Sequence, residues 1–165
     1  MKIKFLAMMM AMSFAMLTMS CSSSDDNGPT TVPDYDIIVG KWESPVPAPI
    51  FGGLISSIEV EFRNNQTYTV LSRNSDGSTT TLEGTYVTST GANGIRNIVL
   101  EQSSPTSLTS TGIYQITQND TRMSYEVVQT SPDLGFAAPT PSGGFGSTAN
   151  GAFGDANIQI YNRIN

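Results

Sequence analysis

The sequence predicts an all-β domain, an eight-stranded antiparallel up-and-down β-barrel, and three observations support this prediction. Residues 58–63 alternate apolar and charged side chains without exception, which is typical of a strand with one buried face. Similar short runs recur along the chain, and Asn, Asp, Gly and Pro separate them. After residue 35 no amphipathic stretch is long enough for a substantial helix, and β-branched and aromatic residues fill the runs.

Eight runs share this pattern. They span residues 41–44, 58–63, 66–73, 79–87, 95–101, 111–117, 122–129 and 157–164. Residues 36–39 could form a single helical turn before the first strand. Because each strand has only one apolar face, the strands must close into a barrel or stack as a β-sandwich. Nearest-neighbour hairpins favour the barrel, and the sandwich remains the alternative.

Two segments are too long for tight hairpin turns. Residues 45–57 are rich in proline but carry apolar side chains, and residues 131–155 are rich in Gly, Ser, Ala and Pro. The second segment contains Phe136, Phe145 and Phe153, each beside a glycine. Long loops in a compact domain are usually functional or disordered. Two hypotheses follow for residues 131–155: a disordered or meandering surface loop, or a lid that folds its phenylalanines onto the domain.

The first twenty residues have the pattern of a secretory signal peptide. Lys2 and Lys4 precede an apolar run that stops at Ser20, and this run is too short for a retained transmembrane helix. Cys21 is the only cysteine, so it has no disulfide partner within the chain. Residues 17–21 resemble the lipobox of bacterial lipoproteins, which implies acylation of Cys21. Simple secretion after Ser20 is the alternative.

Residues 21–34 are polar and acidic, so we expect a flexible tether between an acylated Cys21 and a domain over 35–165. The serines and acidic residues directly after Cys21 also resemble the export signal with which some Gram-negative bacteria place lipoproteins on the surface of the outer membrane. A plain spacer is the alternative. The expected location is therefore the cell outer membrane, with the membrane contacted through the lipid anchor.

Charge and composition exclude several function classes. Eight basic residues face fourteen acidic ones, and no basic stripe is present to neutralise phosphates, so nucleic acid is not an expected partner. The chain has no histidine, which excludes Ser-His-Asp and Cys-His catalysis and the usual zinc sites. Glu59 and Glu61 share one strand face, but that face is the charged one, so solvent exposure explains them. We expect no enzyme, no metal and no cofactor.

The Gly40-Lys41-Trp42 motif at the start of the first strand resembles the Gly-x-Trp signature of lipocalins and of the lipocalin-like domains of bacterial lipoproteins. The resemblance implies a cup of eight antiparallel strands with its longest loop after the first strand. It also implies that Trp42 packs at the closed end against an arginine from the last strand, where Arg163 occupies the matching place. An arginine over an indole face contributes about 0.5–2 kcal/mol.

The candidate ligand-binding residues are the aromatic side chains at the middle of the strands: Phe62, Tyr68, Tyr86, Tyr114 and Tyr125. Core packing is the alternative for each of them. The leading hypothesis is a lipid-anchored module that binds a small apolar or amphipathic ligand. The other is a non-catalytic structural or assembly protein of the outer membrane. A cavity of at least about 300 Å³ would favour binding, and a packed interior with an exposed apolar loop patch would favour the other.

Overall fold

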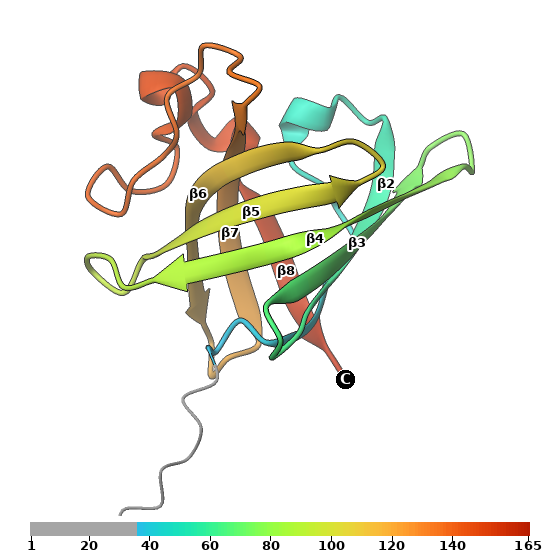
Figure 1. The fold of residues 1–165 in the computed structure, drawn as a ribbon, viewed down its shortest axis with the longest axis horizontal. Coiled ribbons are helices and arrows are strands. Elements are labelled where there is room, and N and C mark those ends of the chain that lie inside the picture. Colours follow the sequence, from blue (N-terminus) through green and yellow to red (C-terminus); the bar gives the residue numbers. More distant parts are fainter. Residues whose placement is uncertain (1–35) are drawn as a thin grey trace, which may run out of the picture. The chain divides into compact units, whose positions relative to one another are not determined.

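The structure is a computed structural model that describes residues 36–165. The predicted signal peptide, Cys21 and the tether lie outside the described residues. Eight strands form one closed antiparallel barrel in chain order, which confirms the predicted fold class and excludes the sandwich (Figure 1). The strands are β1 (Gly40–Ser44), β2 (Ile55–Phe62), β3 (Thr67–Asn74), β4 (Thr79–Ser89), β5 (Arg96–Ser104), β6 (Leu108–Thr117), β7 (Arg122–Ser131) and β8 (Gln159–Ile164).

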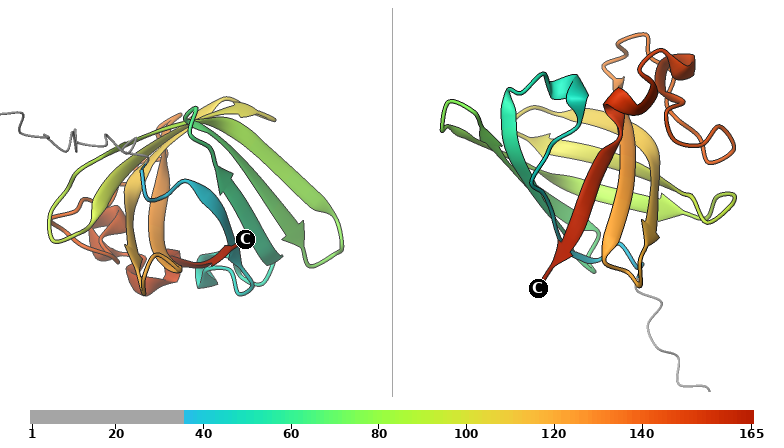
Figure 2. Two further views of the ribbon diagram at one scale, coloured as in Figure 1. Left: turned by 90° about the horizontal axis from the view of Figure 1, so that it is seen from below. Right: turned by 180° about the vertical axis from the view of Figure 1, so that it is seen from behind.

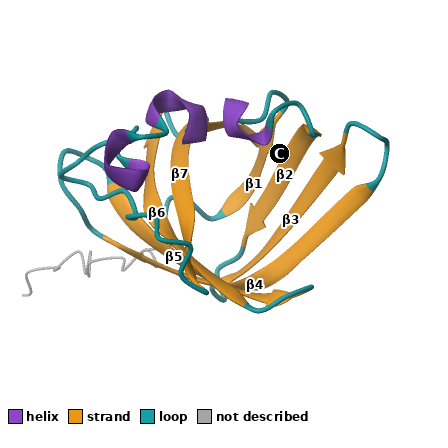
Figure 3. Ribbon diagram, turned by 90° about the horizontal axis from the view of Figure 1, so that it is seen from above, coloured by secondary structure: helices purple, strands orange, loops and turns teal. Residues whose placement is uncertain are grey.

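Helical structure among the described residues is limited to three short 3₁₀ turns. They are η1 (Pro49–Phe51), η2 (Thr148–Gly151) and η3 (Gly154–Asn157). Figure 3 shows them on one side of the barrel, away from β4. None of the described helices has the length and apolar character needed to span a bilayer.

The alternation of residues in β2 sorts its side chains between the two faces of the wall. Ile58, Val60 and Phe62 are at most 5% exposed and belong to the core. Glu59 and Glu61 point outward and form ion pairs with Arg73 at 3.1 Å and Arg63 at 2.5 Å. The alternation therefore has the predicted polarity, and such partly exposed ion pairs contribute little to stability.

The barrel closes where β1 pairs with β8. The register pairs Lys41 with Ile164, Trp42 with Arg163 and Glu43 with Asn162. The view from behind in Figure 2 shows β8, in red, between β7 and β1. This pairing leaves neither the first nor the last strand as an open edge, which is the condition for a stable barrel.

The two ends of the barrel differ. The plugged end carries the turns at 63–66, 90–95 and 118–121, and the chain enters there through the turn at 36–39. That turn is closed by a hydrogen bond from the Val39 amide to the Asp36 carbonyl, 2.9 Å long. It is a turn rather than a helix. The loop end carries segments 45–54, 75–78, 105–107 and 132–158.

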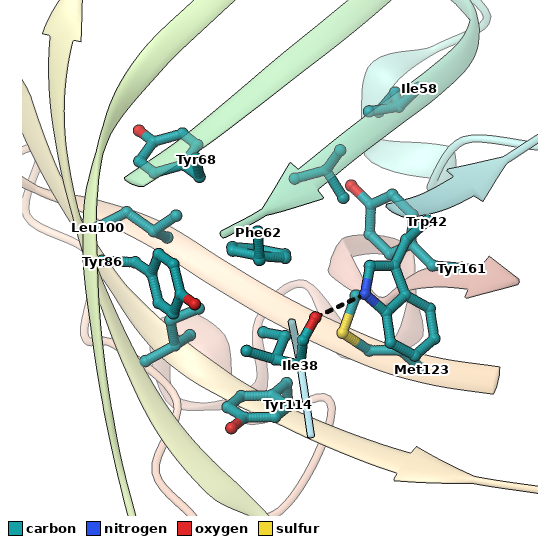
Figure 4. Close-up of a cluster of buried hydrophobic side chains, with 12 residues drawn as sticks. Ile38, Trp42, Ile58, Phe62, Tyr68, Tyr86, Leu100, Tyr114, Met123 and Tyr161 are labelled. Atoms are coloured by element: carbon teal, nitrogen blue, oxygen red, sulfur yellow. Dashed lines mark hydrogen bonds between the residues drawn. The ribbon is translucent and has the colours of Figure 1, made fainter. Parts of the chain in front are cut away.

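Ile38, Trp42 and Met123 fill the plugged end, and each is fully buried (Figure 4). The Trp42 indole N–H donates a hydrogen bond to the Ile38 carbonyl at 2.8 Å. The Arg163 guanidinium lies over the indole, with its central carbon 4.1 Å from the ring centroid. Its three nitrogens donate hydrogen bonds to the carbonyls of Val39, Ile37 and Asp120, at 2.6–2.8 Å.

Gly40 leaves the room that this arrangement needs. A β-carbon at Gly40 would lie 2.5 Å from Nη1 of Arg163, and the backbone there has a φ of +134°. The backbone conformation therefore favours glycine, and a side chain at this position would displace the Arg163 guanidinium. Gly40 and Trp42, the two defined residues of the Gly-x-Trp motif, thus form the surface on which the Arg163 side chain packs.

Asp34–Asn165 forms one compact unit. The closed sheet, the hydrophobic core and the ion pairs between the described residues all lie inside it. Within the described residues 36–165, the closed barrel leaves no sheet edge for another segment to complete. This segment therefore has what it needs to fold on its own.

Replacing Arg163 by alanine should lower the free energy of unfolding by about 2 kcal/mol, because the cation–π contact and the hydrogen bonds to three carbonyls are lost together. The free energy of unfolding of Arg163→Lys should lie between those of wild type and Arg163→Ala. An ammonium group cannot donate to all three carbonyls that the planar guanidinium contacts. Urea denaturation measures both. Arg73→Ala, which removes only a half-exposed ion pair, should change stability by less than about 1 kcal/mol. Equal losses for Arg163→Ala and Arg73→Ala would contradict the closing role of Arg163.

Candidate ligand-binding cavity

The barrel encloses a cavity of about 260 Å³ that extends from the middle of the barrel to the loop end. Five aromatic side chains line it: four come from strands, namely Phe62, Tyr68, Tyr125 and Tyr161, and the fifth is Phe51 of η1. Inward-facing aliphatic side chains line the rest, including Val60, Val70, Leu82, Leu100 and Val127. This lining follows from the two-residue period, which turns every second side chain of each strand inward.

Polar groups line the cavity near the loop end. The Gln159 side chain accepts a hydrogen bond from the Ala48 amide at 2.8 Å and donates one to the Ser44 hydroxyl. The Asn157 side chain donates to the Val127 carbonyl and the Thr148 hydroxyl, each at 3.1 Å. These bonds fix both amides in place, so the polar end of the cavity is preorganised.

Among residues 36–165, no charged side chain lines the cavity. Burial raises the pKa of Tyr68 to about 12. Burial also raises the pKa of Tyr125 and Tyr161 above that of an exposed tyrosine. All three hydroxyls therefore stay neutral at physiological pH, and the cavity suits an uncharged, largely apolar group.

Three of the five predicted ligand-binding residues line the cavity: Phe62, Tyr68 and Tyr125. Tyr86 and Tyr114 are buried outside it, toward the plugged end. The Tyr86 hydroxyl donates a hydrogen bond to the Arg63 carbonyl at 2.9 Å, and its ring packs edge-on against Phe62 at 5.0 Å. The strand positions of the five aromatic residues predicted that their side chains point inward. They could not predict how deep each side chain lies along the barrel axis.

Tyr161 lines the cavity but was not among the predicted ligand-binding residues. A signal for it was present in the sequence. Because Arg163 was expected to reach the interior, the alternation along β8 places Tyr161 and Gln159 on the same inward face. The Tyr161 ring also meets Tyr125 edge-on, with centroids 5.8 Å apart.

Tyr114 belongs to a polar cluster around Asp36 instead. The Asp36 carboxylate accepts hydrogen bonds from the hydroxyls of Tyr114, at 2.7 Å, and Thr88, and it pairs with Arg96 at 3.0 Å. Burial raises the pKa of Asp36, but the hydrogen bonds from Thr88, Tyr114 and the Ile38 amide, together with Arg96, outweigh it and hold the pKa below the usual value of an aspartate. This cluster ties the entering chain to β4, β5 and β6.

Asp36 should make stability depend on acid. Because its pKa is lowered on folding, its contribution is present above about pH 4 and is lost as the pH falls through the lower folded value. Asp36→Asn should cost about 2 kcal/mol at neutral pH. Urea denaturation from about pH 7 to about pH 3 should show the gap between wild type and variant shrinking toward acid. A gap that stays constant over this range would be inconsistent with an ionised Asp36 in the folded barrel.

The long segment 132–158 is an ordered covering of the outer wall beside β6 and β7. None of its phenylalanines lines the cavity, and a role of the segment as a lid that folds them onto the domain stays a prediction. Phe136 and Phe153 pack against each other instead, with ring centroids 5.1 Å apart. Further along, Pro141 reaches the turn between β4 and β5, where a β-carbon on Gly91 would lie 2.6 Å from it.

Glu126 holds this covering in place. It faces outward from β7 opposite Ile113, yet both residues are fully buried. Its carboxylate accepts hydrogen bonds from the amides of Gly146, at 2.7 Å, and Thr148, at 3.0 Å, and from the Thr148 hydroxyl. Nothing in the sequence of the strand marks Glu126 as different from an ordinary exposed glutamate.

Glu126→Gln should loosen the covering, because one carboxylate oxygen is replaced by an NH₂ group that faces an N–H donor. Amide hydrogen exchange at Gly146 and Thr148 should become at least about tenfold faster. Glu101→Gln, at an exposed position of β5, serves as the control and should leave these amides unchanged. Unaltered exchange in Glu126→Gln would show that other contacts hold the segment.

Among residues 36–165, no three His, Cys, Asp or Glu side chains are grouped to hold a metal ion. Glu59 and Glu61, the carboxylates that share one strand face, lie on the outer wall in ion pairs with arginine.

Comparison of the chain with protein-family models, curated proteins and solved structures finds no match. The class of protein is therefore defined by its own geometry. It is a closed eight-stranded antiparallel up-and-down barrel with an uncharged internal cavity, an architecture compatible with a lipocalin-like fold.

Proposed function

We propose that this protein is a lipid-anchored lipoprotein of the cell envelope whose lipocalin-like barrel binds a small apolar or amphipathic ligand without catalysing its conversion. The observation that carries the proposal is the cavity, whose walls are aromatic and aliphatic and whose few polar groups lie near one end. Cavities of this composition bind apolar molecules and use a small number of polar contacts to orient them.

The volume limits the size of the ligand. The cavity of about 260 Å³ falls slightly short of the threshold of about 300 Å³ for small-molecule pockets. A single acyl chain or a small ring system fits this range better than a bulky lipid. A polar head group would sit beside Asn157 and Gln159 or in the solvent beyond them.

The anchor and the location rest on the sequence. The apolar run before Ser20, the lipobox-like residues 17–21 and the polar segment behind Cys21 support acylation of Cys21 and attachment to the outer membrane, with surface exposure as a further proposal. Metabolic labelling with a fatty acid tests this part. Wild type should incorporate label and Cys21→Ala should not, whereas equal incorporation would refute the anchor.

The alternative function is a structural or assembly protein of the outer membrane. One observation favours it: several large apolar side chains on the loops are exposed, among them Val46 at 79% and Leu54 at 75%. Apolar groups exposed together in this way often mark an interaction surface.

Binding of the fluorescent apolar probe N-phenylnaphthylamine to Asp34–Asn165 tests the main proposal. Its fluorescence should rise in a saturable way, and a fatty alcohol should displace it. Val70→Phe and Leu82→Phe add bulk at partly buried cavity walls and should weaken binding at least about tenfold, because the enlarged side chains occupy the space of the probe. Val87→Phe, on the outer wall at a 62% exposed position, is the matched control and should bind like wild type.

Mass spectrometry of small molecules that copurify with the same segment gives the second measurement. A bound apolar compound would identify the ligand class. Equal probe binding by the cavity variants and the Val87→Phe control, with no copurifying compound, would contradict the proposal and favour the structural role.

A further inference from the structure

We propose that the loop end of the barrel docks on the surface of an uncharged or zwitterionic lipid bilayer. The contact surface is a set of exposed apolar side chains, called here the loop-end rim: Val46, Ile50, Leu54, Leu134 and Phe136. They are 40–79% exposed. They come from the two long segments, 45–54 and 132–158, which project at the same end of the barrel (Figure 1).

The rim is continuous with the cavity. Ala48 and Phe51, on the same segment as Val46, Ile50 and Leu54, line the cavity, and so does Asn157 on the other segment. The two segments meet where η1 contacts η3. A surface that covered the rim would therefore also cover the end of the cavity.

The distribution of charge on the barrel favours an uncharged or zwitterionic bilayer over an anionic one. Residues 45–57 carry no charged side chain, and residues 132–158 carry only Asp133 and Asp155. Five of the six basic residues from 36 to 165 lie toward the plugged end: Lys41, Arg63, Arg96, Arg122 and Arg163. The sixth, Arg73, pairs with Glu59 at 3.1 Å. Among residues 36–165, the loop end therefore has no basic side chain outside an ion pair to attract anionic lipid head groups.

The composition of the rim favours lipid over a protein partner. Protein interfaces are enriched in Tyr, Trp, Phe, Met and Arg and carry about ten direct hydrogen bonds, whereas Phe136 is the one residue of these types in the rim. The rim offers aliphatic and phenylalanine side chains, and Gly, Ala and Pro lie between them. Such side chains gain free energy by entering the apolar boundary of a bilayer and require no matching partner groups.

Docking at this end would add a route for ligand exchange to the proposed function. An apolar ligand that leaves the cavity at the rim would enter the bilayer without crossing water, and loading would follow the same path in reverse. This exchange step rests on the proposed ligand-binding function. The docking itself does not, since it depends only on the rim.

Vesicles of phosphatidylcholine mixed with Asp34–Asn165 test the proposal. Because Cys21 lies outside this segment, Leu54→Cys introduces its only thiol, which can be labelled with a polarity-sensitive fluorophore. The emission should shift to the blue when vesicles are added. The same label at Val87→Cys, on the outer wall near the other end and 62% exposed, should keep its emission unchanged.

Cosedimentation with the vesicles supplies the affinity. The double variant Val46→Ser with Leu54→Ser should bind at least about tenfold more weakly than wild type, because two largely exposed apolar groups are lost from the contact. Val87→Ser, the same chemical change away from the rim, should bind like wild type. Adding phosphatidylglycerol should weaken binding or leave it unchanged, since residues 36–165 carry six basic against eleven acidic side chains.

Three results would overturn the docking proposal. They are equal shifts for the labels at positions 54 and 87, binding that requires phosphatidylglycerol, and a dimer in light scattering that the double serine variant dissociates while no vesicle binding occurs. The two proposals fail separately. Vesicle binding without probe binding would refute the ligand cavity and keep the docking surface, and probe binding without vesicle binding would do the reverse.

Discussion

The pairing of β1 with β8 is the constraint on which the rest of the structure depends. It is short, with three register pairs, and it joins the two ends of the domain. Arg163 strengthens it by stacking on Trp42 and by donating hydrogen bonds to carbonyls in the turn at 36–39 and in the turn before β7. Without this closure both terminal strands would expose unpaired backbone groups, and the curved sheet would lose the enclosed interior.

The two ends of the closed barrel are filled to different extents. The plugged end is filled by large side chains and by the turn at 36–39, and it has the Asp36 cluster as a second tie. The loop end has less to fill it, so the barrel keeps a cavity there. The two long segments then contribute to that end in different ways. Both supply cavity wall and exposed apolar side chains, and the second also covers the outer wall through its bonds to Glu126.

Much of the fold could be predicted from the sequence because strand alternation is a local property. All eight strands are present, with boundaries that differ by up to three residues from the predicted ones. The contact between Trp42 and Arg163 followed from a family resemblance in three residues, and the structure supplies the reason for Gly40. What alternation cannot give is the depth of a side chain along the barrel axis. Phe62 and Tyr86 both point inward and touch each other, yet only Phe62 reaches the cavity.

Glu126 shows a second limit of sequence reasoning, because its burial depends on a segment about twenty residues away that folds back over the wall.

The central claim, that the interior at the loop end receives an apolar ligand, is tested most directly by NMR of the methyl groups of Asp34–Asn165 during titration with dodecanol. The cavity predicts shifts at the methyl groups of Val60, Leu100 and Val127, and none at Val87 and Val99, which face outward as a pair. Shifts confined to the outer pair, or no saturable shifts at all, would contradict it.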